Sequence, residues 1–139
     1  MLIKEIMTPH VITVSQKDYT KHALEIMKAN HIHHLVVVDA EEEIIGVLSE
    51  RDLLKVNNVL ASANAEARSG LQGLNVFNVR VATVMTPHPI TLTPRQSVKE
   101  AAKLMVEKHI HSIPIVDNKK LVGIITQQDI LKVVVDKDL

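Results

Sequence analysis

The chain contains one segment twice, and this internal repeat limits the possible folds more than any other feature of its 139 residues. Residues 3–56 recur as residues 81–133, and the heptapeptide MTPHVIT returns as MTPHPIT 78 positions later. The offset between Gly46 and Gly123 is 77, so the second copy lacks one residue before this glycine. Such self-similarity indicates two copies of one supersecondary unit. Because each copy is too small to be stable alone, we expect the copies to pack together and share a core.

The composition excludes several classes of protein. The 16 Lys and Arg residues balance the 16 Asp and Glu residues, without the concentrated basic stripe that nucleic-acid binding requires. The absence of cysteine excludes disulfides and thiolate metal sites and is typical of a reducing compartment. The apolar runs are too short to cross a membrane, and the N-terminal residues do not resemble a secretion signal. We therefore expect a soluble, cytoplasmic protein that binds neither nucleic acid nor a membrane.

Each copy predicts the order strand, helix, strand, turn, strand, helix. Ser97 and Glu100 form an S-x-x-E capping box, which predicts a helix start in the second copy. The first copy has Tyr19 at the position of Ser97, so Asp18 is the expected cap there. Continuous apolar runs predict buried parallel strands, and shorter runs predict the remaining strands. The runs are residues 35–38 and 113–116, the other expected strands are 11–14, 44–48, 90–92 and 121–125, and the last helices are expected to begin near Glu50 and Gln127.

The segment between the copies predicts a helical extension. We place the first repeat at residues 1–60, the linker with its helical extension at 61–80, and the second repeat at 81–139. Apolar residues continue at helical spacing out of the first repeat, which predicts a helix as far as Ser69 with Gly70 as its stop. This helix either covers the core of its own chain or packs on a partner chain.

The pattern that most suggests chemistry is G-h-h-[S/T]-x-x-D, in which h is apolar, and it occurs at residues 46–52 and 123–129. In each occurrence a buried strand delivers a hydroxyl to the first turn of a helix, where unpaired N–H groups and the helix dipole favour an anion. The hydroxyls belong to Ser49 and Thr126, and the carboxylates three residues later belong to Asp52 and Asp129. An ionised carboxylate only accepts hydrogen bonds, so it repels phosphate and suits a pair of hydroxyls such as a ribose diol.

The same residues permit a purely structural interpretation, because S/T-x-x-D is also the sequence of a helix capping box. One occurrence alone would favour the cap. Two occurrences, each behind a glycine and two apolar strand residues inside a repeat, favour a ligand site.

Together with the opening Met-Thr-Pro and a Val-Asp after a buried strand, this pattern resembles a tandem pair of CBS domains. CBS denotes the cystathionine β-synthase motif, which occurs in nucleotide-sensing regulatory modules. The resemblance covers both copies, nearly the whole chain apart from the linker. It implies an α/β fold of two tandem β-α-β-β-α CBS repeats, related by pseudo-twofold symmetry and packed as one module. It also implies two clefts for adenosine ligands: AMP, ADP or ATP foremost, and S-adenosylmethionine or a dinucleotide as further options.

The resemblance assigns roles to the residues of the motif. The Asp of each copy would hold the ribose hydroxyls, and the Ser or Thr hydroxyl would hold a phosphate. Arg51 matches the basic residue that often precedes the Asp in this family, and a guanidinium can bind phosphate through two nitrogens. Gln128 stands at the same position of the second copy, so the second cleft is less suited to a polyphosphate.

The family builds the base pocket from the opening strand of the opposite repeat. The expected pocket residues are Thr8, His10 and Ile12 beside Asp129, and Thr86, His88 and Ile90 beside Asp52. Some family members also use a His at the position of His33 and His111 to meet the phosphates. The two copies differ where Val36 replaces the proline found at Pro114, which can reshape one cleft relative to the other.

The eight histidines suggest metal binding as an alternative, above all in the run HIHH at residues 31–34. The sequence contains no HExxH motif, no cysteine and no convergent carboxylate to complete such a site. Metal binding, phosphate contact, and packing or surface roles therefore stay open for His33 and His111. His31 and His109 are expected at helix ends, where the helix dipole favours an imidazolium.

The sequence therefore predicts a regulatory module rather than an enzyme, because no base lies near the hydroxyls of the motif. We expect it to sense adenosine ligands and to respond by a shift between conformations. The expected partners are an adenine nucleotide, a second copy of the chain in a homodimer, and a separate effector protein. The alternatives are a ligand-free dimerisation or interaction module and a His-based metal-binding protein.

Overall fold

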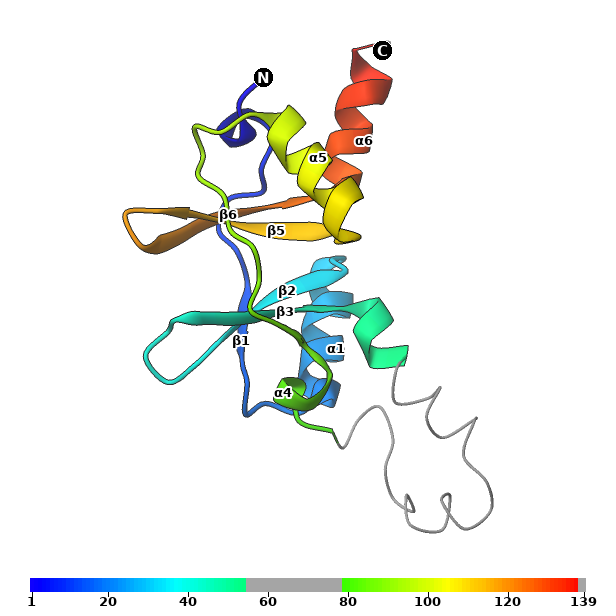
Figure 1. Ribbon diagram of the computed structural model, residues 1–139. Helices are drawn as coiled ribbons and strands as arrows, with labels where there is room; N and C mark the ends of the chain where they lie inside the picture. The colour runs from blue at the N-terminus through cyan, green and yellow to red at the C-terminus, as the bar shows by residue number, and fades with distance from the viewer. Residues whose placement is uncertain (55–78, 138–139) are drawn as a thin grey trace. The chain divides into compact units, whose positions relative to one another are not determined.

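The computed structural model of the protein describes residues 1–54 and 79–137, and it has the expected α/β class (Figure 1). The labelled elements are η1 (Ile3–Glu5), β1 (Thr13–Ser15), α1 (Thr20–Asn30), β2 (His34–Val38), β3 (Ile44–Ser49), α4 (Val81–Val84), β4 (Thr86–Pro87), α5 (Val98–Lys108), β5 (Ser112–Asp117), β6 (Lys120–Thr126) and α6 (Gln127–Asp136). Residues 50–54 are also helical, as expected from the sequence. The predicted continuation of this helix to Ser69 lies outside the described residues.

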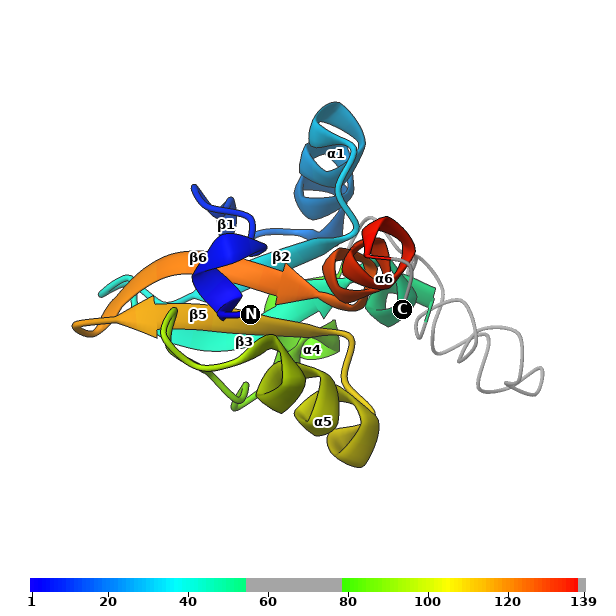
Figure 2. The same ribbon diagram turned by 90° about the horizontal axis from the view of Figure 1, so that it is seen from above.

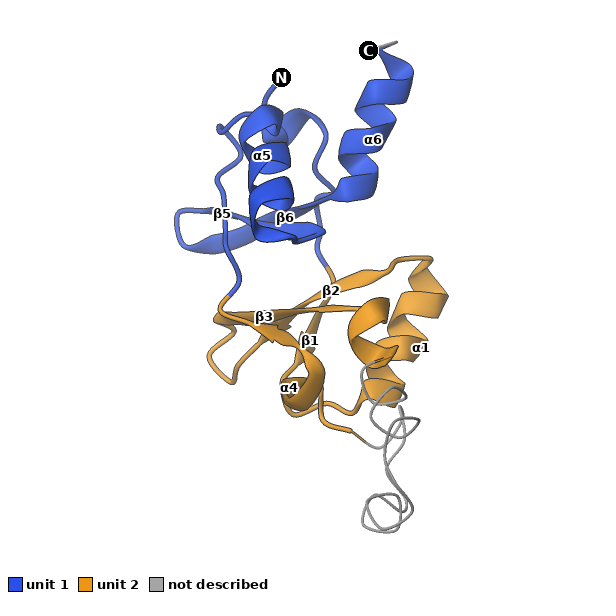
Figure 3. Cartoon of the chain, turned by 45° about the vertical axis from the view of Figure 1, so that its right-hand side comes forward, with its two compact units in different colours: residues 1–11, 89–139 blue, residues 12–88 orange. Residues whose placement is uncertain are grey.

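The chain divides into two compact units that cut across the sequence repeats (Figure 3). Unit 1 consists of residues 1–11 and 89–139, and unit 2 consists of residues 12–88. The first residues of each copy therefore fold with the later part of the other copy. The repeat boundaries given above stay predictions, because they fall partly outside the described residues.

Unit 2 contains a four-stranded sheet in the order β1-β2-β3-β4. The predicted strand at residues 35–38 is present as β2, which pairs in parallel with β1 but antiparallel with β3. β4 was not expected, because the Thr-Pro dipeptide indicated only a turn before a strand. It pairs antiparallel with β3, so that Val47 lies opposite Thr86 and Gly46 opposite Pro87.

Unit 1 is built on the antiparallel hairpin of β5 and β6. Two isolated bridges extend this hairpin: Thr8 pairs with Ile124, and Leu92 pairs in parallel with Ile115. The predicted strand at residues 90–92 is thus reduced to a single bridge. In each unit the helices lie on one face of the strands, α1 and α4 in unit 2 and α5 and α6 in unit 1 (Figures 1 and 2).

Each unit contains an aliphatic core cluster, and each cluster draws on both copies. In unit 2 the buried cluster combines Leu35 and Leu48 of the first copy with Val81 and Val84 of the second. In unit 1 it combines Ile3 of the first copy with residues of the second. The remaining buried members of unit 1 are Leu92, Ala101, Met105, Ile113, Ile115 and Ile125.

The two long helices begin differently and end alike. Ser97 caps α5 as predicted, because its side chain accepts a hydrogen bond from the Glu100 N–H. The other half of the predicted capping box is not formed, since the Glu100 side chain accepts from the Gln96 side chain instead. The prediction that Asp18 caps α1 is wrong, since the N-cap is Tyr19 and Asp18 instead accepts from the Ser15 N–H at 3.0 Å. Both helices end at a histidine in the left-handed conformation, at φ 54° in each copy.

The residue missing from the second copy lies in the turn between its last two strands. Asn118 and Lys119 form a two-residue turn between Asp117 and Lys120, and both have positive φ, at 49° and 65°. Two-residue hairpins favour this geometry because it matches the twist of the strands. The first copy closes its longer turn with Glu42 at φ 61°.

The glycine of each motif allows the Met-Thr segment of the other copy to cross its strand. A Cβ atom added to Gly46 would lie 2.5 Å from Met85 Sδ and 3.0 Å from the Thr86 carbonyl oxygen. A Cβ atom added to Gly123 would lie 2.5 Å from Met7 Sδ. The two most visible motifs of the sequence are therefore in contact, each with its counterpart from the other copy.

Candidate functional site

In unit 2 the motif forms a reciprocal capping box at the start of the helix after β3. The Ser49 N–H donates to Asp52 Oδ2 at 2.8 Å, and the Asp52 N–H donates to Ser49 Oγ at 3.2 Å. Ser49 is half-buried and Asp52 is buried. The structural interpretation of the motif is thus correct as far as the cap is concerned, and this cap holds a hydroxyl and a carboxylate together at a helix N-terminus.

Unit 1 repeats this geometry at the start of α6. The Thr126 N–H donates to Asp129 Oδ2 at 2.8 Å, and the Asp129 N–H donates to Thr126 Oγ1 at 3.3 Å. The Thr126 hydroxyl also lies 3.1 Å from Asp129 Oδ2. Both contacts of the Asp129 carboxylate use Oδ2, which leaves Oδ1 without a hydrogen-bond partner among residues 1–54 and 79–137.

The register of the strands places a threonine of the other copy on the same face as each hydroxyl. Along β3 successive side chains alternate between faces, and Leu48 points into the core of unit 2. Ser49 and Val47 therefore share the other face, together with Thr86, which pairs with Val47. Two residues of strand separate the Ser49 and Val47 positions, which is about 7 Å. In unit 1 the bridge between Thr8 and Ile124 places Thr8 in the same relation to Thr126.

The histidine before each central strand contacts the residue that follows the motif hydroxyl, which is the first residue of the next helix. His33 Nδ1 lies 3.0 Å from Glu50 Oε2, and the Glu50 N–H donates to the His33 carbonyl at 3.1 Å. In unit 1 His111 Nδ1 lies 3.0 Å from Gln127 Oε1, and the Gln127 N–H donates to the His111 carbonyl at 2.9 Å. Each of these two histidines therefore lies in the same unit as the motif of its own copy.

The histidines after the Met-Thr-Pro segments adopt an unusual backbone. His10 has φ 55° and His88 has φ 52°, both in the left-handed region, and both residues are exposed. Residues other than glycine enter this region at a cost, although histidine does so more often than most. The His88 N–H donates to the Ile45 carbonyl at 3.2 Å, which fixes this segment on β3.

The expected pocket residues divide between the units. Unit 1 contains Thr8 and His10 together with Asp129, and unit 2 contains Thr86 and His88 together with Asp52. Ile12 and Ile90 belong to the opposite units, so their predicted places beside Asp129 and Asp52 stay predictions. Ile12 packs on the core of unit 2. Arg51 and Gln128 are both exposed on the first turn of their helices.

The comparison with known proteins identifies the family. The CBS domain family matches residues 3–58 and 81–136, which are the two sequence copies. The chain belongs to the CBS domain family. A CBS domain-containing protein of Dictyostelium discoideum is 31% identical, over 97% of this chain and 92% of that protein. An uncharacterised protein of Methanopyrus kandleri is 39% identical over 94% of this chain, but the chain spans only 61% of its length.

The CBS pair of this chain also resembles solved CBS structures. The CBS domain pair of protein MJ0100, determined in complex with 5′-methylthioadenosine and S-adenosyl-L-methionine, superposes with a TM-score of 0.76. It is 25% identical, over 96% of this chain and 98% of that chain. This confirms the predicted fold, a tandem pair of CBS repeats.

Other features of the described residues lie outside the CBS motif. Residues 1–54 and 79–137 contain no group of three or more His, Asp or Glu side chains arranged to hold a metal ion. Within the same ranges, no helix is both long and apolar enough to cross a membrane. A depression of about 340 Å³ in unit 2 is lined by Gln16, Lys17, Arg80 and Ala82, none of which is a predicted site residue.

Sequence reasoning missed two features of the CBS sites. Glu50 and Gln127 were not recognised as partners of the histidines, although each is the first helical residue after the motif hydroxyl. The left-handed backbone of His10 and His88 was also missed, although Thr-Pro-His occurs in both copies. For Glu50 and Gln127 the signal was their position in the motif. For His10 and His88 the signal was the exact repetition of Thr-Pro-His.

Proposed function

We propose that this CBS pair is a cytoplasmic regulatory module that binds adenosine ligands and transmits the binding as a conformational shift. One observation carries the proposal: each unit combines the hydroxyl and carboxylate of one copy with the threonine and histidine of the other. A ligand that contacts all four groups favours the arrangement in which both copies are engaged. Such a ligand shifts the population by its difference in affinity for the two states.

The ligand class is inferred from the chemistry of the site and from the relative of known structure. The carboxylates of Asp52 and Asp129 only accept hydrogen bonds, which suits the two ribose hydroxyls of a nucleoside. The Ser49 and Thr126 hydroxyls lie at helix N-termini, where a phosphate is favoured. The MJ0100 pair was solved with two adenosine derivatives, which supports an adenosine ligand here. AMP, ADP and ATP are our first candidates, and S-adenosylmethionine is the next.

The two sites differ in their charged groups, and we propose that they differ in ligand charge as well. Unit 2 has Arg51, which can bind a phosphate through two nitrogens, where unit 1 has Gln128. Polyphosphates such as ATP are therefore expected in unit 2 first. Unit 1 is better suited to ligands with one phosphate or none.

A ligand panel tests this function. A ligand with a dissociation constant of about 10 μM stabilises the native state by about 2.7 kcal/mol when its concentration is about 100 times that value. The purified chain is therefore heated with AMP, ADP, ATP, S-adenosylmethionine or GMP, each at this concentration. We expect a raised unfolding midpoint with adenosine compounds and not with GMP. No shift with any adenosine compound would contradict the proposal and favour the ligand-free interaction module.

Variants of the motif locate the binding. A hydrogen bond to a charged group contributes about 1.5–3 kcal/mol, so Asp52→Ala or Asp129→Ala should each weaken one site by roughly 10- to 100-fold. The matched control is Ser97→Ala, which removes a helix cap away from both motifs and should leave the affinity unchanged. Unchanged affinity in both Asp variants would exclude the ribose assignment.

We also propose that the module is a homodimer and that α6 contributes to the interface. Leu131 and Val135 are 56% and 75% exposed on α6, and Leu54 is 54% exposed at the position equivalent to Leu131. None of the residues of α6 is fully buried in the chain, although half of them are apolar. A second copy covers such faces symmetrically, because a twofold interface uses one patch twice.

The oligomeric state is measured by analytical ultracentrifugation of the wild type and of Val135→Lys. We expect a dimer for the wild type and a shift towards monomer for the variant, since lysine cannot be buried without a partner. A monomeric wild type at all concentrations would contradict the homodimer. An effector protein acting downstream of the dimer completes the proposal.

A further inference from the structure

The two sites hold equivalent histidines with chemically different partners. His33 Nδ1 lies 3.0 Å from the carboxylate of Glu50, whereas His111 Nδ1 lies 3.0 Å from the amide oxygen of Gln127. The backbone contacts match as well, because the first helical residue donates its N–H to the histidine carbonyl in both units. The exchange of Glu for Gln is thus the main chemical difference between these two pairs.

A carboxylate and an amide impose different states on an imidazole. An ionised carboxylate only accepts hydrogen bonds, so Nδ1 of His33 must carry a proton when it faces Glu50. A neutral His33 then has its lone pair on Nε2. An amide both accepts and donates, and its oxygen and nitrogen can exchange places. The bond to Gln127 by itself therefore allows His111 to carry its single proton on either nitrogen.

This difference matters for an anionic ligand. Phosphate oxygens are strong acceptors, so they need an N–H from the histidine. His111 can supply Nε2–H as a neutral ring. While it keeps its bond to Glu50, His33 can supply Nε2–H only as an imidazolium, because its first proton is held on Nδ1. As a residue type, histidine exchanges a proton between about pH 5 and 8.

The groups around the pair permit this exchange. The side chain of His33 is 70% exposed and that of Glu50 is 47% exposed, so both ligand and solvent reach the ring. The other titratable or charged groups on adjoining parts of unit 2 are His31 and His34 on the same segment, Arg51 and Asp52 on the helix after β3, and His88 after β4. The corresponding groups of unit 1 are His109, Asp129 and His10, with neutral Gln128 in place of Arg51.

We infer that the site of unit 2 takes up a proton on His33 when it binds an anionic adenosine ligand, whereas the site of unit 1 binds without this uptake. The inference rests on the proposed function and adds a regulation to it. The first site then responds to nucleotide and pH together, and the second to nucleotide alone. One full proton changes the affinity by tenfold per pH unit, and partial uptake by less.

The test is calorimetry of AMP binding at pH 6, 7 and 8, in buffers of different ionisation enthalpy, which counts the protons bound per ligand. Asp129→Ala leaves the site of unit 2 to be measured, with and without Glu50→Gln. We expect the affinity of the Asp129→Ala protein to fall between pH 6 and 8 by about tenfold more than that of the Asp129→Ala, Glu50→Gln protein. The titration of AMP itself is common to both proteins and cancels in the comparison.

Matched variants separate the outcomes. Gln127→Glu in the Asp52→Ala protein should create proton uptake in unit 1, and Glu41→Gln, in an exposed turn of unit 2, should change nothing. If Asp129→Ala does not fold, the wild type is compared with the Glu50→Gln variant instead. The same difference in pH dependence is expected between these two proteins. If AMP still binds and proton uptake is equal with and without Glu50→Gln, the inference is overturned but the proposed function is not. Loss of all adenine-nucleotide binding at every pH would overturn the proposed function and the inference with it.

Discussion

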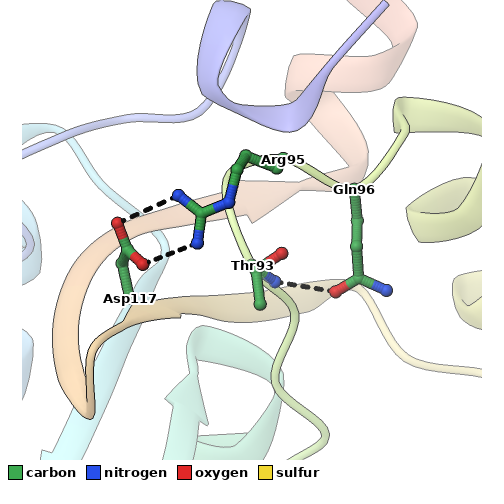
Figure 4. A network of polar contacts seen from close by, with 4 residues as sticks. All are labelled: Thr93, Arg95, Gln96 and Asp117. Atoms are coloured by element: carbon green, nitrogen blue, oxygen red, sulfur yellow. Dashed lines mark hydrogen bonds and ion pairs between the residues drawn. The ribbon is translucent and has the colours of Figure 1, made fainter.

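Arg95 binds Asp117 through two nitrogens, with Nη2 at 2.8 Å from Oδ1 and Nη1 at 3.4 Å from Oδ2 (Figure 4). This pair joins the loop before α5 to the last residue of β5. The same loop is folded by the Gln96 side chain, whose Oε1 accepts from the Thr93 N–H at 2.8 Å. In the first copy, Asp39 stands at the position of Asp117 and accepts instead from two backbone N–H groups of its own turn.

The ion pair predicts an acid-dependent loss of stability. The hydrogen bond from Arg95, aided by its charge, holds the pKa of Asp117 below its usual range. A lowered pKa in the folded state stabilises the fold above the ordinary Asp value of about 3.9, and this contribution is lost as the pH falls through the lowered value. Asp117→Asn should therefore lower the unfolding midpoint slightly at pH 7, with the difference vanishing in strong acid.

The size of this effect is limited by solvent. Arg95 is 64% exposed and Asp117 is 29% exposed, and exposed pairs contribute little and are weakened by salt. Thermal unfolding in low and high salt is the measurement. Lys17→Ala is the matched control, because Lys17 occupies the position of Arg95 and forms no ion pair among the described residues. A difference that persists unchanged at low pH would contradict the prediction.

The contact between glycine and methionine predicts a coupled pair of substitutions. Gly46→Ala places a Cβ atom against Met85 Sδ and the Thr86 carbonyl, and overpacking of this kind costs about 1–3 kcal/mol. Met85→Ala removes the sulfur, so the double variant should regain part of that stability. Urea unfolding measures the interaction energy.

The repeat supplies the control for this cycle. Gly46→Ala combined with Met7→Ala pairs residues of different units, so their effects should add. Gly123→Ala with Met7→Ala should couple like the first pair. Additive effects in both matched pairs would show that the glycines are not required for the crossing.

The two long helices predict different responses to loss of the N-cap residue. Ser97→Ala removes a side-chain cap from α5 and should cost about 1 kcal/mol. Tyr19 makes no such cap on α1, but its ring lies 4.0 Å from the Arg80 guanidinium. Tyr19→Ser should therefore gain a cap and lose a cation–π contact of about 0.5–1 kcal/mol, leaving the stability nearly unchanged. A large loss of stability in Tyr19→Ser, measured by chemical unfolding, would show that the ring contributes more than this contact.

The histidines that end α1 and α5 predict stabilisation by glycine. His31 and His109 both have φ 54°, where glycine has no steric cost and other residues do. His31→Gly or His109→Gly should raise the stability by up to about 1 kcal/mol, after the greater freedom of glycine in the unfolded chain is subtracted. His22→Gly, inside α1, should instead destabilise by about 1 kcal/mol. Destabilisation by both C-cap variants would show that the imidazoles make contacts needed by the fold.

The local elements could be predicted from the sequence because their signals lie within a few residues. The helix cap at Ser97 and the two S/T-x-x-D boxes depend only on residues three apart. The strands β2, β3, β5 and β6 follow from short apolar runs between polar turns. The repeat supported these predictions by a second occurrence of each pattern, and the CBS resemblance followed from the motifs.

The sequence by itself therefore determined the two copies, their main helices and strands, and the pairing of hydroxyl and carboxylate in each motif. Only the tertiary structure decided that Met7 crosses Gly123 and Met85 crosses Gly46, because such contacts depend on packing between distant segments. It also decided that Glu50 and Gln127 hold the site histidines. Local patterns follow from backbone geometry over one or two turns. The packing of each Met-Thr segment on the motif of the other copy follows instead from burial of apolar surface, which depends on the whole fold.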